Sequence, residues 1–569
     1  MKRYIYLIIV IVIGVCFFSC EDFLEPETDN RIDEDYLKSN PAAAEGILLR
    51  AYIDLPGSYD FSIESATDDA VTNNFDLSIW AMANGQWSAT NDPVSTWSGY
   101  EQIFYLNSFL EIKDEVQWDF NSERAHELNL QRLTGEAFGL RAWYQFMLLQ
   151  SHAGPSPDGT MLGFPIILEP LGIQDDWKLP RNTFEECITQ IISDCDSAIA
   201  NLPDKYMDIP GDNIYNMTMG ARWTNRFTAN AAKALKSRAL LYAASPAFNM
   251  SGGNTKWEAA AIFTGSFLNE NGGISAISPT GLNFWIYPAG GPADPEIIWG
   301  SSIYQSNDLE QTYYPPSHYG QAEVNPTQEL VNAFPMANGY PITHQDAGFD
   351  ENYPYHNRDP RLEKFIIRDS SVYGVKGLIR TYLGFPVNGI NQQTNSTRTG
   401  YYLRKLLLEN VTIFPIPVSQ IHFYTYIRFT EILLNYAEAA NEAWGPDNGG
   451  TVGITARNAL ITIRNRAGIS QPDSYLASVI EKDDMRELIR SERRIELCFE
   501  GHRFYDIRRW DDKSTMKSPV TGVKVTPGTP NSFEYFQVEP RNYQDHMIYG
   551  PIPYNEILKY SGLIQNKGW

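Results

Sequence analysis

The sequence predicts a mainly α-helical protein in which stacked pairs of helices form a scaffold beside a loop-rich region with a few short strands. Apolar residues recur at helical spacing in a series of segments, and these segments occur in neighbouring pairs. Long stretches rich in Gly, Pro, Asn and aromatic residues separate the pairs. No alternation of strands and helices supports a parallel sheet.

The N-terminus has the layout of an export signal. Lys2 and Arg3 precede an apolar run that ends at Phe18, and Ser19 and Cys20 follow. The run is shorter than the ~20 residues that span a bilayer, and acidic residues flank it. We expect residues 1–19 to be a lipoprotein signal peptide, with lipid attached to Cys20. An ordinary signal peptide with an incidental cysteine is the alternative.

Composition limits the classes of partner. The chain has 569 residues and a formal net charge of −24, with 43% hydrophobic residues. The length and hydrophobic content support a large core, a repeat architecture or several domains. Nucleic acid and anionic lipid surfaces are poor partners for so acidic a protein, because both demand a basic face. Neutral ligands or cationic partners fit better.

Three cysteines remain after the signal peptide and the lipidated residue are set aside. Cys187 and Cys195 are eight residues apart on one predicted helix, which is roughly 12 Å and beyond disulfide reach. We interpret both, with Cys498, as small core residues.

The helix pairs are predicted in chain order. Asn40-Pro41 is a capping residue followed by proline in the first turn, and Thr183 with Glu186 forms a capping box for a helix of about five turns. Further helical patterns run over 122–152, 228–244, 256–270, 426–444, 453–467 and 483–500. Because no helix could bury its apolar face alone, we expect the pairs to stack over about 38–53, 94–270 and 426–510.

The loop-rich region is expected over about 54–93 and 272–424. Non-helical segments of this length in a compact protein are usually functional. Short β-type runs at 296–299 and 364–367 predict a few strands inside it.

Segment 490–509 carries acidic residues that could suggest acid–base catalysis. Glu492, Glu496 and Glu500 recur every four residues, and His502 and Asp506 follow. Arginines are interleaved with them, so each carboxylate has a cationic neighbour that keeps it ionised. We interpret the segment as a structural salt-bridge network. The chain contains no H-E-x-x-H, G-x-S-x-G, Walker-type or G-x-G-x-x-G pattern.

Aromatic residues on loops, close to short polar side chains, suggest a ligand site. Sugars present apolar C–H faces ringed by hydroxyls, and such ligands need flat rings beside carboxylates and amides. The predicted ligand-binding residues are Asp68, Asp69, Asn73, Trp80, Trp87, Trp285, Tyr304, Tyr313 and Tyr314. Core packing is the alternative for each ring. Asp68 and Asp69 with Glu64 are also a minority candidate for a calcium site.

A set of motifs runs through the whole chain in a constant order. They are CEDFL at 20–24, RAWYQF at 141–146, GFPI at 163–166, ALKSRALLYAASP at 234–246, RDPRL at 358–362, RFTEILLNYAEA at 428–439, IRNRAG at 463–468, ERRIELCFEGHRFYDIRRW at 492–510, PIP at 551–553 and QNKGW at 565–569. With these motifs the chain resembles the SusD-like (SusD/RagB) family of outer-membrane nutrient-binding lipoproteins.

The resemblance implies a tetratricopeptide-like helix-pair scaffold, the SusD-like fold, as one domain over 20–569. It also implies a lid on a SusC-type TonB-dependent transporter at the cell surface, anchored in the outer membrane by lipid on Cys20. Glycan is the expected ligand and peptide the alternative. A glycosidase would need two carboxyl groups roughly 5–10 Å apart in a cleft, and no such pair can be placed. We expect a binding protein that is not an enzyme and has no cofactor.

Overall fold

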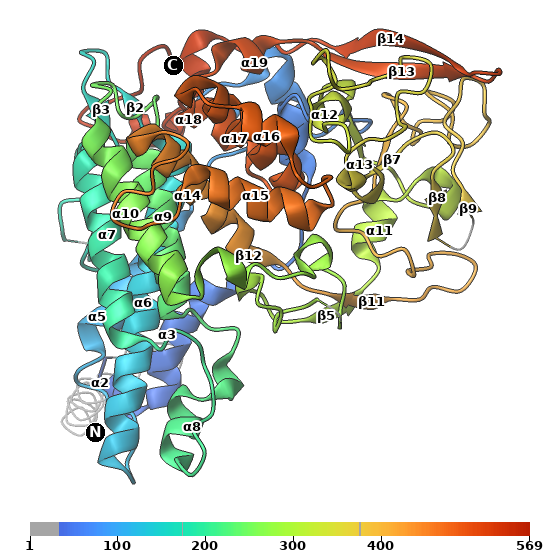
Figure 1. Cartoon of the computed structure of the whole chain (residues 1–569). Helices are drawn as coiled ribbons and strands as arrows, with labels where there is room; N and C mark the ends of the chain where they lie inside the picture. The colour runs from blue at the N-terminus through green and yellow to red at the C-terminus, as the bar shows by residue number, and fades with distance from the viewer. Residues whose placement is uncertain (1–33, 173, 289, 375–376) are drawn as a thin grey trace, which may run out of the picture.

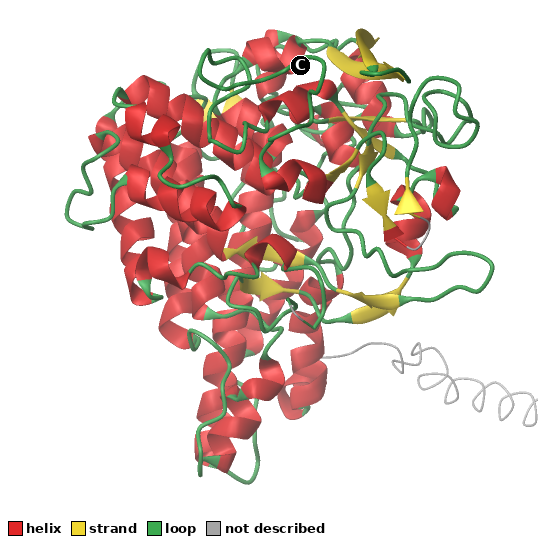
Figure 2. Ribbon diagram, turned by 45° about the vertical axis from the view of Figure 1, so that its right-hand side comes forward, coloured by secondary structure: helices red, strands yellow, loops and turns green. Residues whose placement is uncertain are grey.

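The computed structural model describes residues 34–172, 174–288, 290–374 and 377–569. Cys20 and the predicted signal peptide lie outside this range. Long helices fill one side of the molecule, and loops with short strands fill the other (Figures 1 and 2). The prediction of a mainly α-helical fold with minor β structure is confirmed.

The longer helices form the scaffold. It begins with α2 (Glu34–Ser39), α3 (Pro41–Ile53), α5 (Gly99–Ile112), α6 (Glu123–His152), α7 (Phe184–Asn201), α8 (Asn213–Met219), α9 (Ala229–Ala244) and α10 (Asn254–Glu270). After the loop-rich region it resumes with α14 (Phe429–Trp444), α15 (Ala456–Ala467), α16 (Ser474–Ser478), α17 (Lys482–Leu497), α18 (Arg503–Arg509) and α19 (Lys513–Lys517).

Neighbouring helices in this series pack on one another, as the pairing predicted. Helix α6 contacts α5 and α7, α7 contacts α9, and α10 contacts α9 and α14, which in turn contacts α15 and α17. Their apolar faces share one large core that includes Cys187 and Cys195, both free thiols. Stacking buries the face that each helix alone would expose to water.

Capping residues set the helix starts that the sequence predicted. The Asn40 side chain accepts from the amide of Ala43, and Thr183 and Glu186 form the capping box of α7. Helix α14 begins at Phe429, later than the predicted 426, because the preceding residues form a strand. Helix α17 ends at Leu497, earlier than the predicted 500, and Phe499 has a positive φ of 63°.

The loop-rich side carries short elements. Its strands are β1 (Ala70–Thr72), β4 (Ile297–Gly300), β5 (Tyr304–Ser306), β6 (Val324–Pro326), β7 (Ile366–Ile367), β8 (Val372–Tyr373), β9 (Gly377–Leu378), β10 (Tyr402–Leu403), β11 (Gln420–His422), β12 (Thr425–Arg428), β13 (Val520–Thr526) and β14 (Ser532–Glu539). Short helices α4 (Ser78–Ala81), α11 (Asp308–Tyr313), α12 (Gln328–Ala333) and α13 (Pro360–Phe365) lie among them. Strands β2 (Gly154–Pro155) and β3 (Met161–Leu162), and helix α20 (Tyr554–Ile557), lie on the scaffold side.

Every sheet in the described residues is a two-stranded antiparallel pair, which agrees with the absence of a parallel-sheet pattern. Strand β1 pairs with β6, β4 with β12, and β13 with β14. A strand predicted at 296–299 is present as β4. The run at 364–367 is a strand only at its end, because helix α13 occupies its first half. A second hydrophobic core lies beneath these loops.

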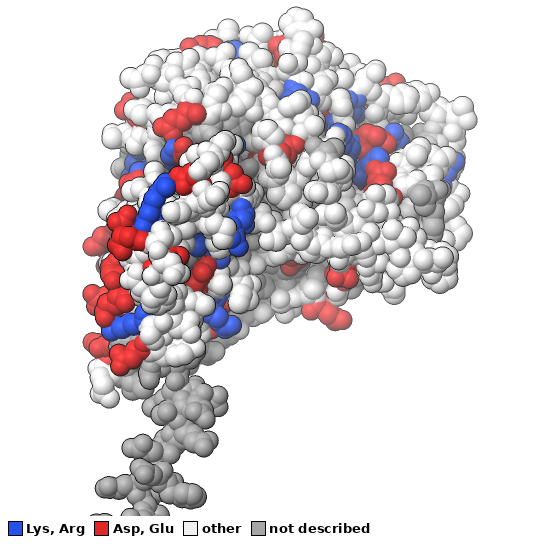
Figure 3. All heavy atoms as spheres, turned by 90° about the horizontal axis from the view of Figure 1, so that it is seen from below, with Lys and Arg blue, Asp and Glu red and all other residues white. Residues whose placement is uncertain are grey.

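The distribution of charged side chains on the surface agrees with the acidic composition. In the view of Figure 3, acidic side chains gather over the helical side, while most of the loop-rich side in that view is uncharged. In the part of the chain that the structure describes, no helix combines the length and apolar character needed to cross a bilayer.

Candidate ligand-binding surface

Trp87, a predicted ligand residue, is buried in the scaffold core. Its ring is 4% exposed and packs edge-on against Trp569, with ring centroids 5.0 Å apart. The indole nitrogen donates to Asp92 over 2.9 Å, and the Arg508 guanidinium lies 5.0 Å from the ring. A ring enclosed on both faces has no surface for a sugar, so the structure assigns Trp87 to packing.

Three further predicted rings belong to the second core. Trp285 packs against Phe365, and the Tyr313 hydroxyl accepts from the amide of Phe61. Tyr314 is 1% exposed and donates its hydroxyl hydrogen to the carbonyl of Leu408. These rings pack the loops against one another, as the core-packing alternative predicted. They form no exposed platform.

Asp68 and Asp69 are buried ion-pair partners of two arginines. Asp68 accepts from Arg503 over 2.8 and 2.9 Å, and Arg494 lies 2.8 Å from Asp68 and 2.7 Å from Asp69. Burial raises the pKa of Asp69, whereas for Asp68 the two arginines outweigh burial and lower the pKa. The two guanidinium groups thus occupy carboxylate oxygens that a calcium ion would need.

A third buried carboxyl lies beside this pair. Glu64 accepts from the amide of Gly501, and burial together with Asp69 raises its pKa to about 8. Within the described ranges, no group of three or more His, Cys, Asp or Glu side chains is arranged to hold a metal ion.

Asn73 and Tyr304 lie at the surface but apart from the buried set. The Asn73 amide donates to the carbonyls of Gln321 and Ala322 and so holds the end of β1 to the loop before β6. Tyr304 stacks on His422, with centroids 5.9 Å apart and planes at 29°. It lines a separate cavity of about 530 Å³. The predicted residues therefore do not form one continuous site.

Trp80 is the predicted tryptophan that forms the centre of an open aromatic surface. Its ring meets that of Phe75 at a centroid distance of 5.1 Å and an angle of 64°. Phe75 is 53% exposed, and Trp80 is half-buried. We name the set Phe75, Trp80, Asn84, Arg398 and Glu539 the Trp80 surface.

Polar groups hold the Trp80 ring in place. Its indole nitrogen donates to Glu539 over 3.1 Å, and the Asn84 amide donates to the carbonyl of Trp80 over 2.9 Å and to Glu539 over 3.3 Å. Arg398 donates to Glu539 over 2.7 Å, and its guanidinium lies 4.8 Å from the Phe75 ring. Two fixed rings thus stand beside a guanidinium and an amide.

Local backbone and remote strands build this surface. Helix α4 carries Trp80 and leads into a one-turn π-helix over Met82–Gln86, in which Gly85 has φ 98°, a value that favours glycine. Glu539 ends β14, and Arg398 comes from the loop before β10. The Asn84-Gly85 turn is visible in the sequence as a turn signal. Arg398 and Glu539 have no sequence signal that places them near Trp80.

The acidic segment at 490–509 forms the predicted salt-bridge network, but with different partners. Glu496 pairs with Arg361, Arg428 and Arg466, at 2.9, 3.2 and 2.6 Å. These arginines come from α13, β12 and α15, not from the segment itself. Burial alone would raise the pKa of Glu496, but the three arginines outweigh it and lower the pKa to about 2. A general acid needs the opposite shift.

Comparison with known proteins identifies relatives over most of the chain. A model of the SusD family matches residues 295–569, and a model described as starch-binding associating with the outer membrane matches residues 22–241. Two SusD-like proteins of Formosa agariphila are similar in sequence. One is 25% identical over 549 residues, which cover 91% of this chain and 93% of the relative. The other is 29% identical over 146 residues, or 25% of each chain.

Solved structures share the fold. A SusD-like protein from Bacteroides fragilis has a TM-score of 0.73 and 25% identity, over 96% of this chain and 100% of that one. A SusD-like carbohydrate-binding protein from the same organism has a TM-score of 0.72 and 21% identity, over 93% and 99%. A surface glycan-binding protein A from Bacteroides fluxus has a TM-score of 0.61 and 19% identity, over 93% and 100%.

Proposed function

Because the chain belongs to the SusD-like family, we propose that it captures oligo- or polysaccharide at the cell surface and delivers it to a SusC-type TonB-dependent transporter. The observation that carries the glycan proposal is the Trp80 surface. It combines two open rings with polar groups on the loop-rich side of a fold whose family model describes starch binding.

The two rings suit a sugar because they present faces at different angles. A pyranose stacks its C–H face on one ring, while its hydroxyls reach polar groups around the edge. Trp80 and Phe75 stand at 64°, so one ring can lie under a sugar unit while the other contacts its side or the next unit. Arg398 lies at the edge of the same surface and has N–H donors besides the nitrogen that bonds Thr72 and Glu539. Both N–H groups of Asn84 are already bonded, so Asn84 offers its amide oxygen as an acceptor.

The carboxylate in this surface acts as a support for binding and not for catalysis. Glu539 is buried and accepts from Trp80, Asn84, Arg398 and Arg541. Donors from the protein thus occupy both of its oxygens, whereas a glycosidase needs carboxyl groups that can reach the scissile bond. The glycosidase alternative therefore gains no support at this surface.

Peptide cargo is the second candidate, and β14 favours it. This strand pairs with β13 and has no other strand neighbour among the described residues, so its outer edge carries backbone donors and acceptors. An extended peptide could add to such an edge. Binding assays should therefore include unstructured oligopeptides alongside glycans.

Lipid on Cys20 and a transporter partner complete the proposal. An anchor at Cys20 would leave the described domain outside the membrane. That position suits a protein that delivers ligand to an outer-membrane transporter. Co-purification tests the partner directly. A tagged full-length chain, extracted from its native outer membrane in mild detergent, should retain a TonB-dependent barrel, and a chain carrying Cys20→Ala should lose membrane attachment.

The glycan proposal is tested with the soluble chain that begins at residue 21. Affinity gels that contain starch, β-glucan, mannan or xylan should retard it in at least one case, and Trp80→Ala should clearly weaken that retardation. Phe120→Ala is the matched control, because Phe120 is 70% exposed and lies outside the Trp80 surface. Undiminished retardation of the Trp80 variant, or binding to peptides alone, would reject the proposed site.

A further inference from the structure

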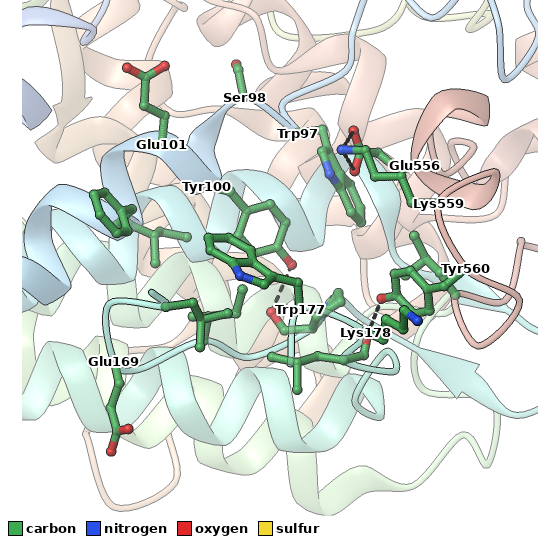
Figure 4. A pocket seen from close by; sticks show the side chains of 17 residues that line it. Trp97, Ser98, Tyr100, Glu101, Glu169, Trp177, Lys178, Glu556, Lys559 and Tyr560 are labelled. Carbon is green, nitrogen blue, oxygen red and sulfur yellow. Dashed lines mark hydrogen bonds and ion pairs between the residues drawn. The ribbon is translucent and has the colours of Figure 1, made fainter. Parts of the chain in front are cut away.

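A cavity of about 520 Å³ lies on the helical side of the molecule, apart from the Trp80 surface. It is bounded by the start of α5, by the chain between β3 and α7, and by the C-terminal segment around α20 (Figure 4). The two sites share no residue. Pockets that bind small ligands have volumes of about 300–1,000 Å³, so this cavity has room for one or two sugar units.

Five aromatic side chains line this cavity. Tyr100 and Phe104 lie one turn apart on α5, and Trp97 precedes the helix. Trp177 comes from the chain before α7, and Tyr560 follows α20. In Figure 4 the rings of Trp97, Tyr100, Trp177 and Tyr560 surround a common space. We name these five residues the Trp177 cage.

The polar ends of the rings are already bonded within the protein. Tyr100 donates its hydroxyl hydrogen to the carbonyl of Pro165 over 2.8 Å, and Tyr560 donates to that of Leu179. The Trp177 indole donates to the carbonyl of Gly172 over 2.9 Å. These bonds fix the orientation of the rings and leave their faces as the contact surface. Preorganised rings lose little conformational entropy when a ligand binds.

Trp177 is 54% exposed, although an indole is among the side chains that gain most from burial. The turn that carries it is held by its own contacts, because Asp175 accepts from the amide of Gly172 over 2.6 Å. A large ring held open above a cavity by such contacts is the arrangement expected of a ligand platform.

The charges around the cavity disfavour an anionic ligand. Glu556 and Lys559 neutralise each other at 2.7 Å. The other charged lining residues are Lys178, Glu101 and Glu169, so one carboxylate is in excess, and both glutamate carboxylates lie at the edge of the cage in Figure 4. No arginine lines the cavity to bind an anion bidentately, and a cation would gain little from carboxylates at the edge.

We propose that the Trp177 cage is a second saccharide-binding site that takes a neutral sugar unit by stacking on Trp177 and Tyr100. The choice of saccharide rests on the proposed function, whereas the existence of a neutral-ligand site rests on the cage itself. Two sites that hold one long glycan would bind it more tightly than either site alone, by up to 10²–10⁴-fold, if the glycan can span them.

Titration calorimetry on the soluble chain tests the second site. The probes are cellohexaose, laminarihexaose, maltohexaose, mannohexaose and xylohexaose. We expect at least one to bind at two sites, and we expect Trp177→Ala to remove one of them with at least a tenfold loss of its affinity. Phe104→Ala, at an exposed position of the cage, should weaken the same site, and Phe120→Ala should change neither.

The outcomes separate this inference from the proposed function. One binding site that Trp80→Ala abolishes and Trp177→Ala leaves intact would overturn the second site and keep the function. Binding that only the cage variants reduce would keep the cage and reject the Trp80 surface. Binding at two sites that survive both cage variants, or no binding of any hexasaccharide, would overturn the second site.

Discussion

Replacing Glu496 by glutamine should remove a large part of the stability of the fold. Glu496 is buried and accepts charge-assisted hydrogen bonds from Arg361, Arg428 and Arg466. Glutamine keeps the size of the side chain but leaves three guanidinium groups facing a neutral amide. Removing one partner of a buried ion pair costs about 3–5 kcal/mol, because the remaining charge stays buried without compensation.

The pKa of Glu496 gives a second value for the free energy that its carboxylate contributes to stability. A fall from 4.5 to about 2 corresponds to about 3 kcal/mol, at roughly 1.4 kcal/mol per pH unit. The folded pKa is depressed, so this stabilisation is complete above pH 4.5 and is lost as the pH falls through 2. Glu496→Gln should therefore cost about 3 kcal/mol at pH 7 and little near pH 2.

Urea unfolding followed by circular dichroism, at a series of pH values, measures this difference. Glu487→Gln is the matched control, because Glu487 lies on the same helix α17 with 72% of its side chain exposed, and its loss should stay within about 0.5 kcal/mol. A Glu496 variant as stable as the control at pH 7, or a difference that does not shrink in acid, would refute the network as a source of stability.

Three further substitutions give separate checks. Trp87→Ala should cost about 3–5 kcal/mol in urea unfolding and leave glycan affinity unchanged, because the ring packs in the core; lost affinity in a stable variant would contradict its burial. Burial and Asp69 raise the folded pKa of Glu64 from 4.5 to about 8, so its contribution to stability, complete below pH 4.5, is lost as the pH rises through 8. Glu64→Gln should therefore flatten the decline in unfolding free energy between pH 5 and 9, and an unchanged decline would argue against the raised pKa. Thr183→Ala should cost about 1 kcal/mol through loss of the α7 cap, measured by the same unfolding assay, and a change near zero would mean that the cap is dispensable.

The sequence predicts the scaffold well because its signals are local. Thr183 and Glu186 mark the start of α7 through contacts three residues apart, and the apolar spacing along α6 is enough to find that helix. Helix α17 was predicted about one turn too long, because its apolar pattern continues past Leu497 while Phe499 adopts a left-handed conformation. Local pattern does not report that change of backbone direction.

The ligand surface was only partly predictable because burial of a ring depends on distant residues. Trp80 and Trp87 look alike in the sequence, but Trp569, at the far end of the chain, covers Trp87. Glu539 reaches Trp80 from 459 residues further along the chain, and Arg398 joins it from a third segment. No spacing along the sequence carries that information.

The charged network shows the same limit. Alternating acids and arginines correctly predicted that the carboxylates of 490–509 are paired. The pairing of Glu496 with Arg361, Arg428 and Arg466 depends on how α13, β12 and α15 pack on α17. Charge pattern alone suggested partners on the same segment, which is correct for Asp506 with Arg509 and wrong for Glu496.

A crystal structure of the soluble chain with the tightest-binding oligosaccharide of the panel would test the central claim most directly. We expect a sugar ring within about 4 Å of the Trp80 ring, the distance of apolar contact, with hydroxyls near Asn84 or Arg398. An oligosaccharide bound elsewhere, with the Trp80 and Phe75 rings free of contact, would contradict the assignment of the Trp80 surface as the glycan site.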